Sequence, residues 1–306
     1  MKPWIKIVLS MFIIIGLVFG GVFGYTLYQL GKVKTIEISK TDEDLGIKTT
    51  IPVKEEENNE VINIALFGVD RREKNEPSRS DSMIILSIDQ KHKKIKMSSI
   101  MRDTFVKIKD HGETKLTHAY AYGGPQLAIR TLNENFNLNI RDYVTVDFLN
   151  FEKIIDAIGG VTIDVKQDEI GLIPQITKSG SQKLNGLQAV AYSRIRHTAG
   201  DDFRRTERQR TVLSAMIANI QSVGATKFPS VVTKLLPFTE TSMNSMDLIK
   251  LGTKVITSNT TKLVQDRFPT DGYWSGKTIN GVWYLVADMK ATVEQIHKFI
   301  YEDIKP

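Results

Sequence analysis

A long apolar stretch near the N-terminus is the first feature of the hydrophobic pattern. The 25 residues between Lys6 and Lys32 carry no charge, and a helix of that length, at about 1.5 Å per residue, exceeds a hydrocarbon core of about 30 Å. Tyr25 and Tyr28 lie near one end, where interfacial aromatic residues are expected. A cleaved signal peptide would have a shorter apolar region before a small-residue cleavage site, and none is evident. We therefore predict one transmembrane helix over residues 7–31, acting as a signal anchor.

The pattern divides the whole chain into four parts. Residues 1–6 form a tail so short that a cytoplasmic N-terminus is favoured, which places the chain beyond the helix outside the cell membrane. Residues 32–60 are polar, contain no aromatic residue and are expected to form a linker. Residues 61–306 contain no long low-complexity tract and no internal repeat. They are predicted to form one extracellular domain.

Strand-like and helix-like segments alternate within this domain. Runs of strand length predict strands at 61–68, 82–89, 93–100, 143–148, 160–165 and 281–288. Helical spacing of apolar residues predicts helices after the Gly-Gly-Pro break at 123–125 and at 149–158, 184–195, 202–220 and 292–301. This alternation is typical of an α/β fold with a mixed central β-sheet flanked by helices on both faces.

Composition and charge exclude several kinds of site. The 306 residues are 41% hydrophobic and 25% charged, as in an ordinary folded chain. The absence of cysteine excludes disulfides, thiolate metal sites, a cysteine nucleophile and a lipid-modified cysteine. Lys2 and Lys6 contribute two charges to the net charge of +6 and precede the apolar stretch. The remaining excess is too small to indicate a nucleic-acid partner by itself.

Two aspartates lie at neighbouring ends of the first two predicted strands. Asp70 follows the run 61–68 and Asp81 precedes the run 82–89. Antiparallel pairing of these strands would bring both carboxylates to one edge of the sheet. Mg²⁺ typically takes a few carboxylate oxygens together with water and ligand phosphates. The alternative, which this spacing alone favours, is that both aspartates are ordinary turn residues.

A third strand end adds charged residues to this edge. Arg79 lies close to Asp81, and Arg102 and Asp103 end the third run. A single arginine is usually a solvated surface charge, but arginines that recur beside carboxylates at strand ends favour a shared site. The expected role of Asp103 is an ion pair with Arg102.

Eighteen residues at the junction of two predicted helices contain six arginines. Arg194 and Arg196 lie at the end of the first helix, and Arg205, Arg208 and Gln209 lie at the start of the second. Guanidinium groups stay charged and bind phosphate oxygens in pairs, and a helix N-terminus also favours anions. The alternative is a solvated, charged helix whose neighbouring acids neutralise the cluster.

Five motifs in a consistent order resemble the LytR-CpsA-Psr family of cell-wall proteins. They are GVDRR…RSDSM, SIMRDT, GGVTIDV, LNGLQAVAYSRIRH and DDFRRTERQR, and they cover nearly all of residues 61–222. The resemblance implies a membrane-anchored phosphotransferase outside the cytoplasmic membrane. Such an enzyme moves an anionic glycopolymer, such as wall teichoic acid, from undecaprenyl diphosphate to a peptidoglycan sugar hydroxyl. A phosphodiester forms and undecaprenyl phosphate is released.

The resemblance also implies roles for individual residues. Asp70 and Asp81 match the family's ligands for Mg²⁺, with Mn²⁺ as the alternative ion. The positions that match its pyrophosphate-binding residues are Arg79, Arg102, Arg194, Arg196, Arg205, Arg208 and Gln209. The residues expected to take part in catalysis are Arg102, Asp81, Arg196 and Arg205. The family often has proline before the Arg-Asp pair, where this chain has Met101, a change expected to alter backbone stiffness more than chemistry.

The expected partners are a polyprenyl diphosphate-linked glycopolymer, peptidoglycan and the cell membrane, and two other functions remain open. With water as acceptor, the same site would be a polyprenyl diphosphate hydrolase. A membrane-bound transcriptional attenuator or regulator would bind nucleic acid through its arginines, but a domain outside the membrane meets no DNA, so no nucleic-acid partner is expected. The five histidines are scattered and offer no metal triad. An apolar channel for the prenyl tail is implied, but periodicity does not identify its residues.

Overall fold

The computed structural model describes residues 34–48, 61–71, 78–196 and 202–306. The tail at 1–6 and the transmembrane helix predicted over residues 7–31 lie outside these ranges. Within them, no helix is both long and apolar enough to cross a membrane.

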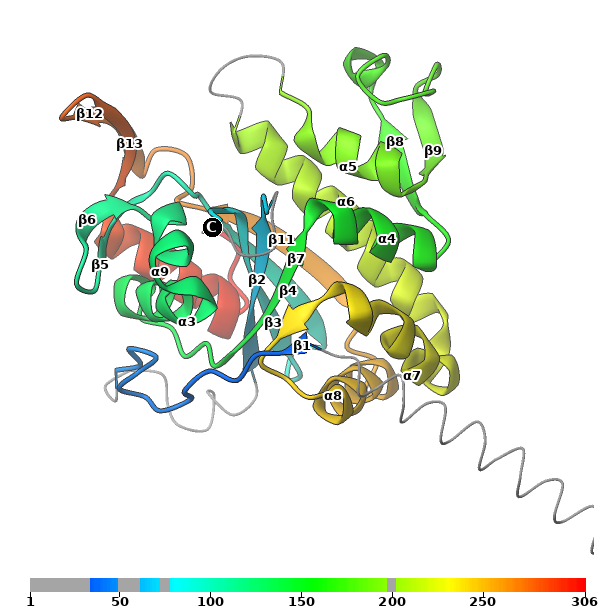
Figure 1. Cartoon of the computed structure of the whole chain (residues 1–306), viewed down its shortest axis with the longest axis horizontal. Helices are drawn as coiled ribbons and strands as arrows, with labels where there is room; N and C mark the ends of the chain where they lie inside the picture. The colour runs from blue at the N-terminus through cyan, green and yellow to red at the C-terminus, as the bar shows by residue number, and fades with distance from the viewer. Residues whose placement is uncertain (1–33, 49–60, 72–77, 197–201) are drawn as a thin grey trace, which may run out of the picture.

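A seven-stranded mixed sheet forms the centre of the described chain (Figure 1). Its strands, in chain order, are β1 (Lys34–Thr35), β2 (Val61–Val69), β3 (Ser80–Asp89), β4 (Lys94–Ile100), β7 (Asp142–Asp147), β10 (Glu240–Thr241) and β11 (Lys262–Phe268). Across the sheet the order is β1-β10-β7-β2-β3-β4-β11. β2 pairs antiparallel with β3 and parallel with β7, so the prediction of a mixed sheet is confirmed.

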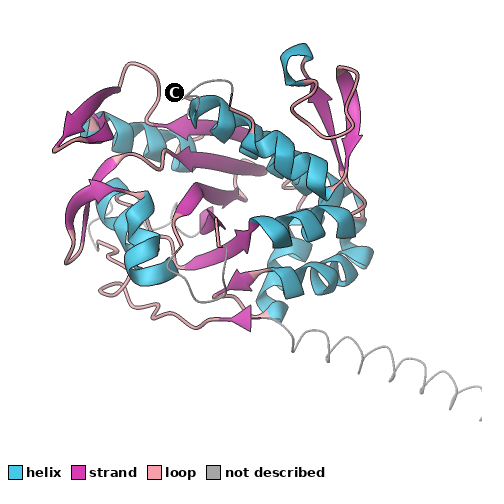
Figure 2. Cartoon of the chain, turned by 45° about the horizontal axis from the view of Figure 1, so that its top comes forward, coloured by secondary structure: helices cyan, strands magenta, loops and turns pink. Residues whose placement is uncertain are grey.

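Helices cover both faces of the sheet, as predicted (Figures 1 and 2). α3 (Thr117–Phe136) and α9 (Met289–Tyr301) pack on one face, where Phe67, Phe136 and Phe299 share a buried cluster. The helices on the other side are α4 (Phe148–Ala157), α5 (Gly186–Arg194), α6 (Asp202–Ser222), α7 (Gly224–Leu235) and α8 (Ser245–Thr257). Because both faces are covered, the central strands read as nearly continuous apolar runs instead of a clean alternation.

Helix α3 begins earlier than the sequence predicts. The predicted helix after the Gly-Gly-Pro break is present, but a further helical segment precedes the break. Gly123 and Gly124 leave helical geometry, and Gly124 has φ 62° and ψ −157°. A glycine adopts that conformation without a Cβ penalty, and Pro125 then restarts the helix, so the two segments join at a kink.

Three two-stranded hairpins lie outside the central sheet. They are β5 (Phe105–Ile108) with β6 (Gly112–Lys115), β8 (Val161–Val165) with β9 (Gly180–Leu184), and β12 (Trp274–Ile279) with β13 (Val282–Ala287). The strands predicted at 160–165 and 281–288 therefore form, but not as members of the central sheet. Two short 3₁₀ helices, η1 (Gln167–Glu169) and η2 (Leu236–Phe238), complete the described elements.

Part of the predicted linker at 32–60 belongs to the folded domain. β1 adds to the edge of the sheet by pairing with β10. Leu45 is fully buried in the cluster beneath α3, and its carbonyl accepts a hydrogen bond from the Asn133 side chain (2.9 Å). The segment is mostly polar, so its composition gave no indication of the few contacts that attach it to the domain.

Candidate active site

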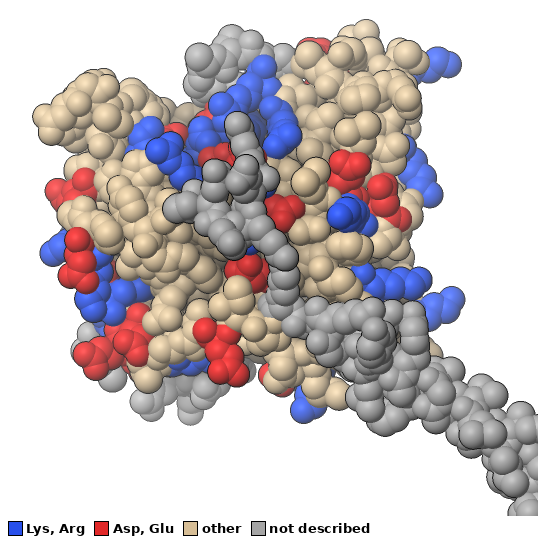
Figure 3. All heavy atoms as spheres, in the orientation of Figure 1, with Lys and Arg blue, Asp and Glu red and all other residues tan. Residues whose placement is uncertain are grey.

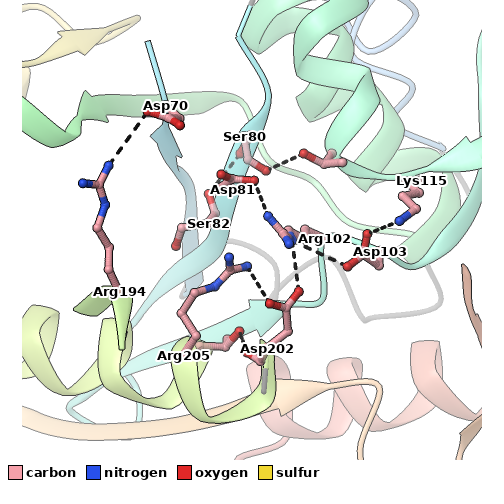
Figure 4. Close-up of polar contacts among 12 residues, drawn as sticks. Asp70, Ser80, Asp81, Ser82, Arg102, Asp103, Lys115, Arg194, Asp202 and Arg205 are labelled. Carbon is pink, nitrogen blue, oxygen red and sulfur yellow. Dashed lines mark hydrogen bonds and ion pairs between the residues drawn. The ribbon is translucent and has the colours of Figure 1, made fainter. Parts of the chain in front are cut away.

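The ends of three neighbouring strands meet at one edge of the central sheet. β2 pairs antiparallel with β3, and β3 with β4, so the end of β2, the start of β3 and the end of β4 coincide. Asp70 follows β2, Asp81 is the second residue of β3 and Arg102 follows β4. Figure 4 shows the three side chains at this edge. The predicted convergence of three strand ends is confirmed.

Helices α5 and α6 bring the arginine-rich segment to the same edge. The Asn185 side chain accepts a hydrogen bond from the Gln188 N–H (2.9 Å), and the Gln188 side chain accepts one from the Asn185 N–H (3.0 Å). This reciprocal cap starts α5 at Gly186, two residues later than predicted. α5 ends at Arg194, and α6 begins at Asp202.

Arg102 is held among three carboxylates. Its Nη1 donates to Asp81 Oδ1 (2.5 Å), and its Nε donates to Asp202 Oδ2 (3.1 Å) and lies 3.5 Å from Asp103 Oδ2 (Figure 4). Burial alone would lower the pKa of Arg102, but the charges of these carboxylates outweigh it and raise the pKa. Asp103 also pairs with Lys115 (2.7 Å). The expected ion pair between Arg102 and Asp103 is present.

Asp202 joins three of the predicted arginines. Arg196 and Arg205 lie 3.3 and 3.4 Å from its Oδ1, opposite the contact with Arg102. Burial raises the pKa of the Asp202 carboxyl and outweighs the charges of Arg102 and Arg196. Arg205 is 5% exposed, and its buried Nε has no hydrogen-bond partner among the described residues. A buried guanidinium N–H without a partner is costly, so it fits a site that receives an anion.

Arg194 approaches the edge from α5. Its guanidinium lies 3.9 Å from Asp70 Oδ1 and 3.7 Å from the centre of the Phe148 ring. The side chain is half exposed, so it can contact a ligand from the solvent side. Figure 3 shows Lys and Arg side chains gathered between the part of the molecule that carries β12–β13 and the part that carries α5.

The other predicted phosphate-binding residues lie in different surroundings. Arg208 is buried, with its Nε 2.7 Å from Glu169 Oε1 and its Nη1 donating to the Ile195 carbonyl (3.1 Å). This ion pair fixes η1 to α6. Gln209 lines the cavity described below. Arg79 is exposed beside β3.

Met101 forms a backbone contact that proline at this position would lack. Its N–H donates to the Phe268 carbonyl at the end of β11 (3.0 Å). The side chain is buried, with its sulfur 3.9 Å from Thr206 Oγ1 on α6. The departure from the family pattern therefore gives β4 and β11 one more hydrogen bond just before Arg102.

An apolar cavity of about 240 Å³ lies between the sheet and the helices beside the arginines. Its apolar lining comes from Leu66, Phe67, Ile84, Val144, Val146, Phe148, Phe151, Ile154, Leu213, Met216 and Leu235. Ser193 and Gln209 also line it and adjoin Arg194 and Arg208 in the chain, while Ser82 adjoins Asp81. Cavity lining and core share one hydrophobic pattern, so the sequence did not distinguish these residues.

The side chains of Asp70 and Asp81 are chemically suited to bind a magnesium ion. Both offer hard carboxylate oxygens at the same edge, and their side chains are 39% and 25% exposed. Mg²⁺ is usually bound by one or two carboxylates, several waters and substrate phosphates, which such an accessible pair permits.

Another acidic cluster lies at the opposite end of β3. Asp89, His92 and Asp303 place potential ligand atoms within 4.8 Å of one another. The fully buried Lys96 already provides a cation there, with its Nζ 2.6 Å from Asp89 and 3.4 Å from Asp303. This cluster is therefore an internal ion-pair network that binds the C-terminal residues to β4.

Lys115 and Glu169 are partners of the site's charges that sequence reasoning missed. Each comes from a short element, twelve residues beyond Asp103 for Lys115 and 39 residues before Arg208 for Glu169, and no motif marks it. Asp202 was recognisable as a possible neutraliser of the arginine cluster. The described site thus combines several guanidinium groups, two accessible carboxylates and an apolar cavity, which suits an anionic head group with an apolar tail.

Known proteins show the same combination of sequence and fold. MsrR, named a regulatory protein, of Staphylococcus aureus (strain COL) is 35% identical over 206 residues, which are 66% of this chain and 61% of MsrR. The match therefore spans less than two thirds of that relative. TagT of Bacillus subtilis (strain 168), named a polyisoprenyl-teichoic acid–peptidoglycan teichoic acid transferase, is 32% identical over 240 residues, 74% of this chain and 73% of TagT.

Solved structures of TagT share the fold. The structure of TagT bound to LI-WTA has a TM-score of 0.69 at 24% identity, and that of YwtF (TagT) with bound octaprenyl pyrophosphate lipid has a TM-score of 0.65 at 23% identity. Each comparison covers 88% of this chain and 98% of the other. The profile of the LytR_cpsA_psr family matches residues 25–299. With nearly the whole domain matched in sequence and the same fold around the arginines, the chain belongs to the LytR_cpsA_psr family.

Proposed function

We propose that this protein is a phosphotransferase that attaches an anionic glycopolymer, with wall teichoic acid as the first candidate, to a peptidoglycan sugar hydroxyl. The observation that carries the proposal is the meeting of Arg102, Arg194, Arg196 and Arg205 beside an apolar cavity. A polyprenyl diphosphate has the matching chemistry, with two phosphates at one end of an apolar chain. The names of TagT and of its complex with octaprenyl pyrophosphate support the same class of donor.

The arginines would act by binding and neutralising the diphosphate. In the proposed step, the oxygen of the acceptor hydroxyl forms a bond to the phosphorus that carries the polymer, and the hydroxyl proton passes to solvent. The bond from that phosphorus to the bridging oxygen breaks, and undecaprenyl phosphate departs with the electron pair. Arg102, Arg196 and Arg205 can neutralise the negative charge that develops on the phosphate oxygens, which is the main demand of phosphoryl transfer.

Asp70 and Asp81 are the proposed ligands of Mg²⁺ or Mn²⁺. When bound, the ion would neutralise charge on the diphosphate oxygens. Asp81 also pairs with Arg102, so this carboxylate would serve both the metal ion and the guanidinium.

The proposed orientation places this reaction outside the cytoplasmic membrane. It rests on the membrane helix expected over the apolar stretch at 7–31 and on the family to which the chain belongs. The donor lipid would then enter the cavity from the membrane to which the protein is anchored.

The name of MsrR favours a regulator as the second candidate function, and a hydrolase remains the third. One experiment separates the three. The full chain in detergent micelles is given an undecaprenyl diphosphate-linked glycopolymer labelled in the polymer, with and without peptidoglycan. A transferase makes labelled peptidoglycan and needs the acceptor, a hydrolase releases labelled polymer phosphate without it, and a protein that only regulates leaves the donor intact, which would overturn the proposal.

A further inference from the structure

The β12–β13 hairpin carries two tryptophans on one face. Trp274 pairs with Ala287 and Trp283 pairs with Thr278 in the antiparallel register, and the two pairs are four positions apart along each strand. Side chains alternate between faces, so both indoles lie on the same side of the hairpin. Trp283 is 45% exposed, an unusual degree for so large an apolar ring.

Gly276 provides the place where the Trp283 ring lies. A Cβ added at Gly276 would lie 2.8 Å from Trp283 Nε1 and 3.2 Å from two further ring atoms. The indole is therefore in contact with the backbone of β12, and any larger residue would displace it. The exposed ring has a defined position.

This face is continuous with the candidate active site. Lys115 lies between the hairpin and the site, with its Nζ 2.7 Å from Asp103, 6.0 Å from the Trp283 ring centre and 5.9 Å from that of Tyr284 on the other face of β13. The Leu285 N–H of β13 donates to the Asp103 carbonyl (3.0 Å). These contacts place the hairpin directly beside Arg102.

A second aromatic connection runs from α6. Phe203, next to Asp202 in the first turn, has its ring centre 4.9 Å from that of Trp274. The Phe203 ring also contacts Arg267, whose guanidinium carbon lies 4.4 Å from the ring centre. Phe203, Trp274 and Trp283, with Lys115 and Arg267 beside them, are called the aromatic face below.

We propose that the aromatic face binds the glycan of the peptidoglycan acceptor, next to the sugar whose hydroxyl reacts. The inference rests on the proposed function, and it names the surface that positions the second substrate. Pyranose rings have apolar C–H faces that stack on indole and phenyl rings, while their hydroxyl and amide groups need polar partners. Rigid aromatic side chains lose little conformational entropy when they bind a ligand. A glycan chain lying on this face would bring a neighbouring sugar to the arginine edge.

A membrane surface fits the hairpin less well. A hairpin that inserts into an interface would carry its aromatic residues at the tip. Here the tip is Asn280–Gly281, both at positive φ, and the tryptophans extend from Trp283, two residues beyond the tip, to Trp274 at the far end of β12. Lys277 and Thr278 are also exposed on β12. The arrangement suits a polar ligand with apolar faces.

Direct binding tests the proposal without any transfer reaction. The probe is a soluble, uncross-linked tetrasaccharide of alternating N-acetylglucosamine and N-acetylmuramic acid, titrated calorimetrically into the full chain in detergent micelles. We expect Trp283→Ala to weaken binding at least tenfold. Gly276→Val should do the same although both indoles are retained, because the added side chain displaces the Trp283 ring. Tyr273→Ala is the matched control, since Tyr273 is a similarly exposed aromatic residue (42%) that immediately precedes β12 and is not part of the aromatic face.

The outcomes separate this proposal from the proposed function. If the wild type transfers polymer and Trp283→Ala keeps the same KM for the acceptor glycan, the aromatic face is not the acceptor site although the function stands. If the glycan binds and Trp283→Ala abolishes binding while no transfer occurs, the function fails and the surface stands. Tryptophan fluorescence that shifts with phosphatidylglycerol vesicles but not with glycan would overturn the proposal in favour of a membrane contact. Circular dichroism confirms that each variant is folded.

Discussion

Arg102 is the residue on which the charges of the site depend. It contacts Asp81, Asp103 and Asp202 at once, so three carboxylates surround one guanidinium, and the proposed diphosphate would compete with them. A carboxylate network of this kind orients the guanidinium groups, which would reduce the reorganisation that binding of the proposed donor requires. The geometry of the guanidinium should therefore matter as well as its charge.

The first prediction tests that geometry with Arg102→Lys. Lysine keeps the positive charge near the three carboxylates but loses the planar pair of donors. We expect a fold close to the wild type and a transfer rate lower by about 100-fold or more, comparable to the loss of one donor to a developing oxyanion. The matched control is Arg130→Lys, because Arg130 forms a similarly buried ion pair with Glu134 (2.7 Å) far from the site. Equal transfer rates in the two variants would remove Arg102 from the mechanism.

The second prediction concerns the proposed metal ligand Asp81. We expect Asp81→Asn to weaken Mn²⁺ binding at least tenfold in the presence of a polyprenyl diphosphate, as followed by electron paramagnetic resonance, because an amide is a poorer ligand for a hard cation. Asp164→Asn changes an exposed aspartate on β8 and serves as the control. Unchanged Mn²⁺ affinity in Asp81→Asn would mean that this carboxylate serves only to hold Arg102.

At the scale of elements, α6 connects the charged edge with the cavity. Asp202, Arg205 and Gln209 lie near its start, and Leu213 and Met216 line the cavity about one and two turns further on. One helix thus carries residues for both ends of the proposed donor.

The third prediction fills the cavity from α6 by Leu213→Trp. The larger ring should occupy space needed by a prenyl chain, and overpacking should cost about 1–3 kcal/mol of stability. We expect binding of octaprenyl diphosphate to fall at least tenfold, measured by calorimetry, while inorganic pyrophosphate binds as before. Thr211→Trp alters the same helix without lining the cavity. Full binding of the lipid by Leu213→Trp would show that the prenyl chain lies elsewhere.

The fourth prediction concerns the buried ion pair between η1 and α6. Glu169 is 1% exposed and Arg208 5% exposed, with 2.7 Å between them. Glu169→Gln leaves the Arg208 charge uncompensated, so we expect a loss of about 3–5 kcal/mol in the free energy of unfolding by urea. The double variant with Arg208→Met should recover part of this loss. In contrast, Asp42→Asn removes the exposed partner of Arg141 and should cost less than about 1 kcal/mol.

At the scale of the whole molecule, the features that could be predicted from the sequence are those that depend only on the pairing of consecutive strands. Antiparallel pairing of consecutive strands is enough to bring Asp70 and Asp81 together, and Arg102 follows from the next strand. The expectation that Arg194 and Arg196 lie at this edge came from the family resemblance, because no local pattern in the sequence specifies how α5 and α6 pack on the sheet.

Features that depend on long-range packing were not predictable. Arg208 shares a helix face with Arg205 by spacing, yet burial against η1 directs it to Glu169. β13 has the pattern of a central strand but forms an outlying hairpin, because β11 takes the place beside β4. The burial of Leu45 depends on α3, far along the chain. In each case the deciding partner is distant in sequence.

Two histidines link the stability of the whole domain to pH. Burial lowers the pKa of His297 on α9, although its Nε2–H donates to the carbonyls of Phe136 (3.1 Å) and Asn137 (2.8 Å). Burial and nearby cationic side chains also lower the pKa of His118. In the unfolded chain both should titrate near 6.5.

The fifth prediction follows from the sign of these shifts. Below pH about 6.5 the unfolded chain binds protons that folded His297 and His118 do not yet take up, so the free energy of unfolding should rise with pH through this interval and level off above it. His297→Gln keeps an N–H donor for the two carbonyls but cannot take up a proton, and should show a smaller loss of stability between pH 7.5 and 5.5 in urea titrations. Asp202, whose raised pKa acts in the opposite sense, is present in both proteins, so the difference between them isolates His297. Parallel profiles for wild type and variant would show that the junction of α3 and α9 does not sense protons.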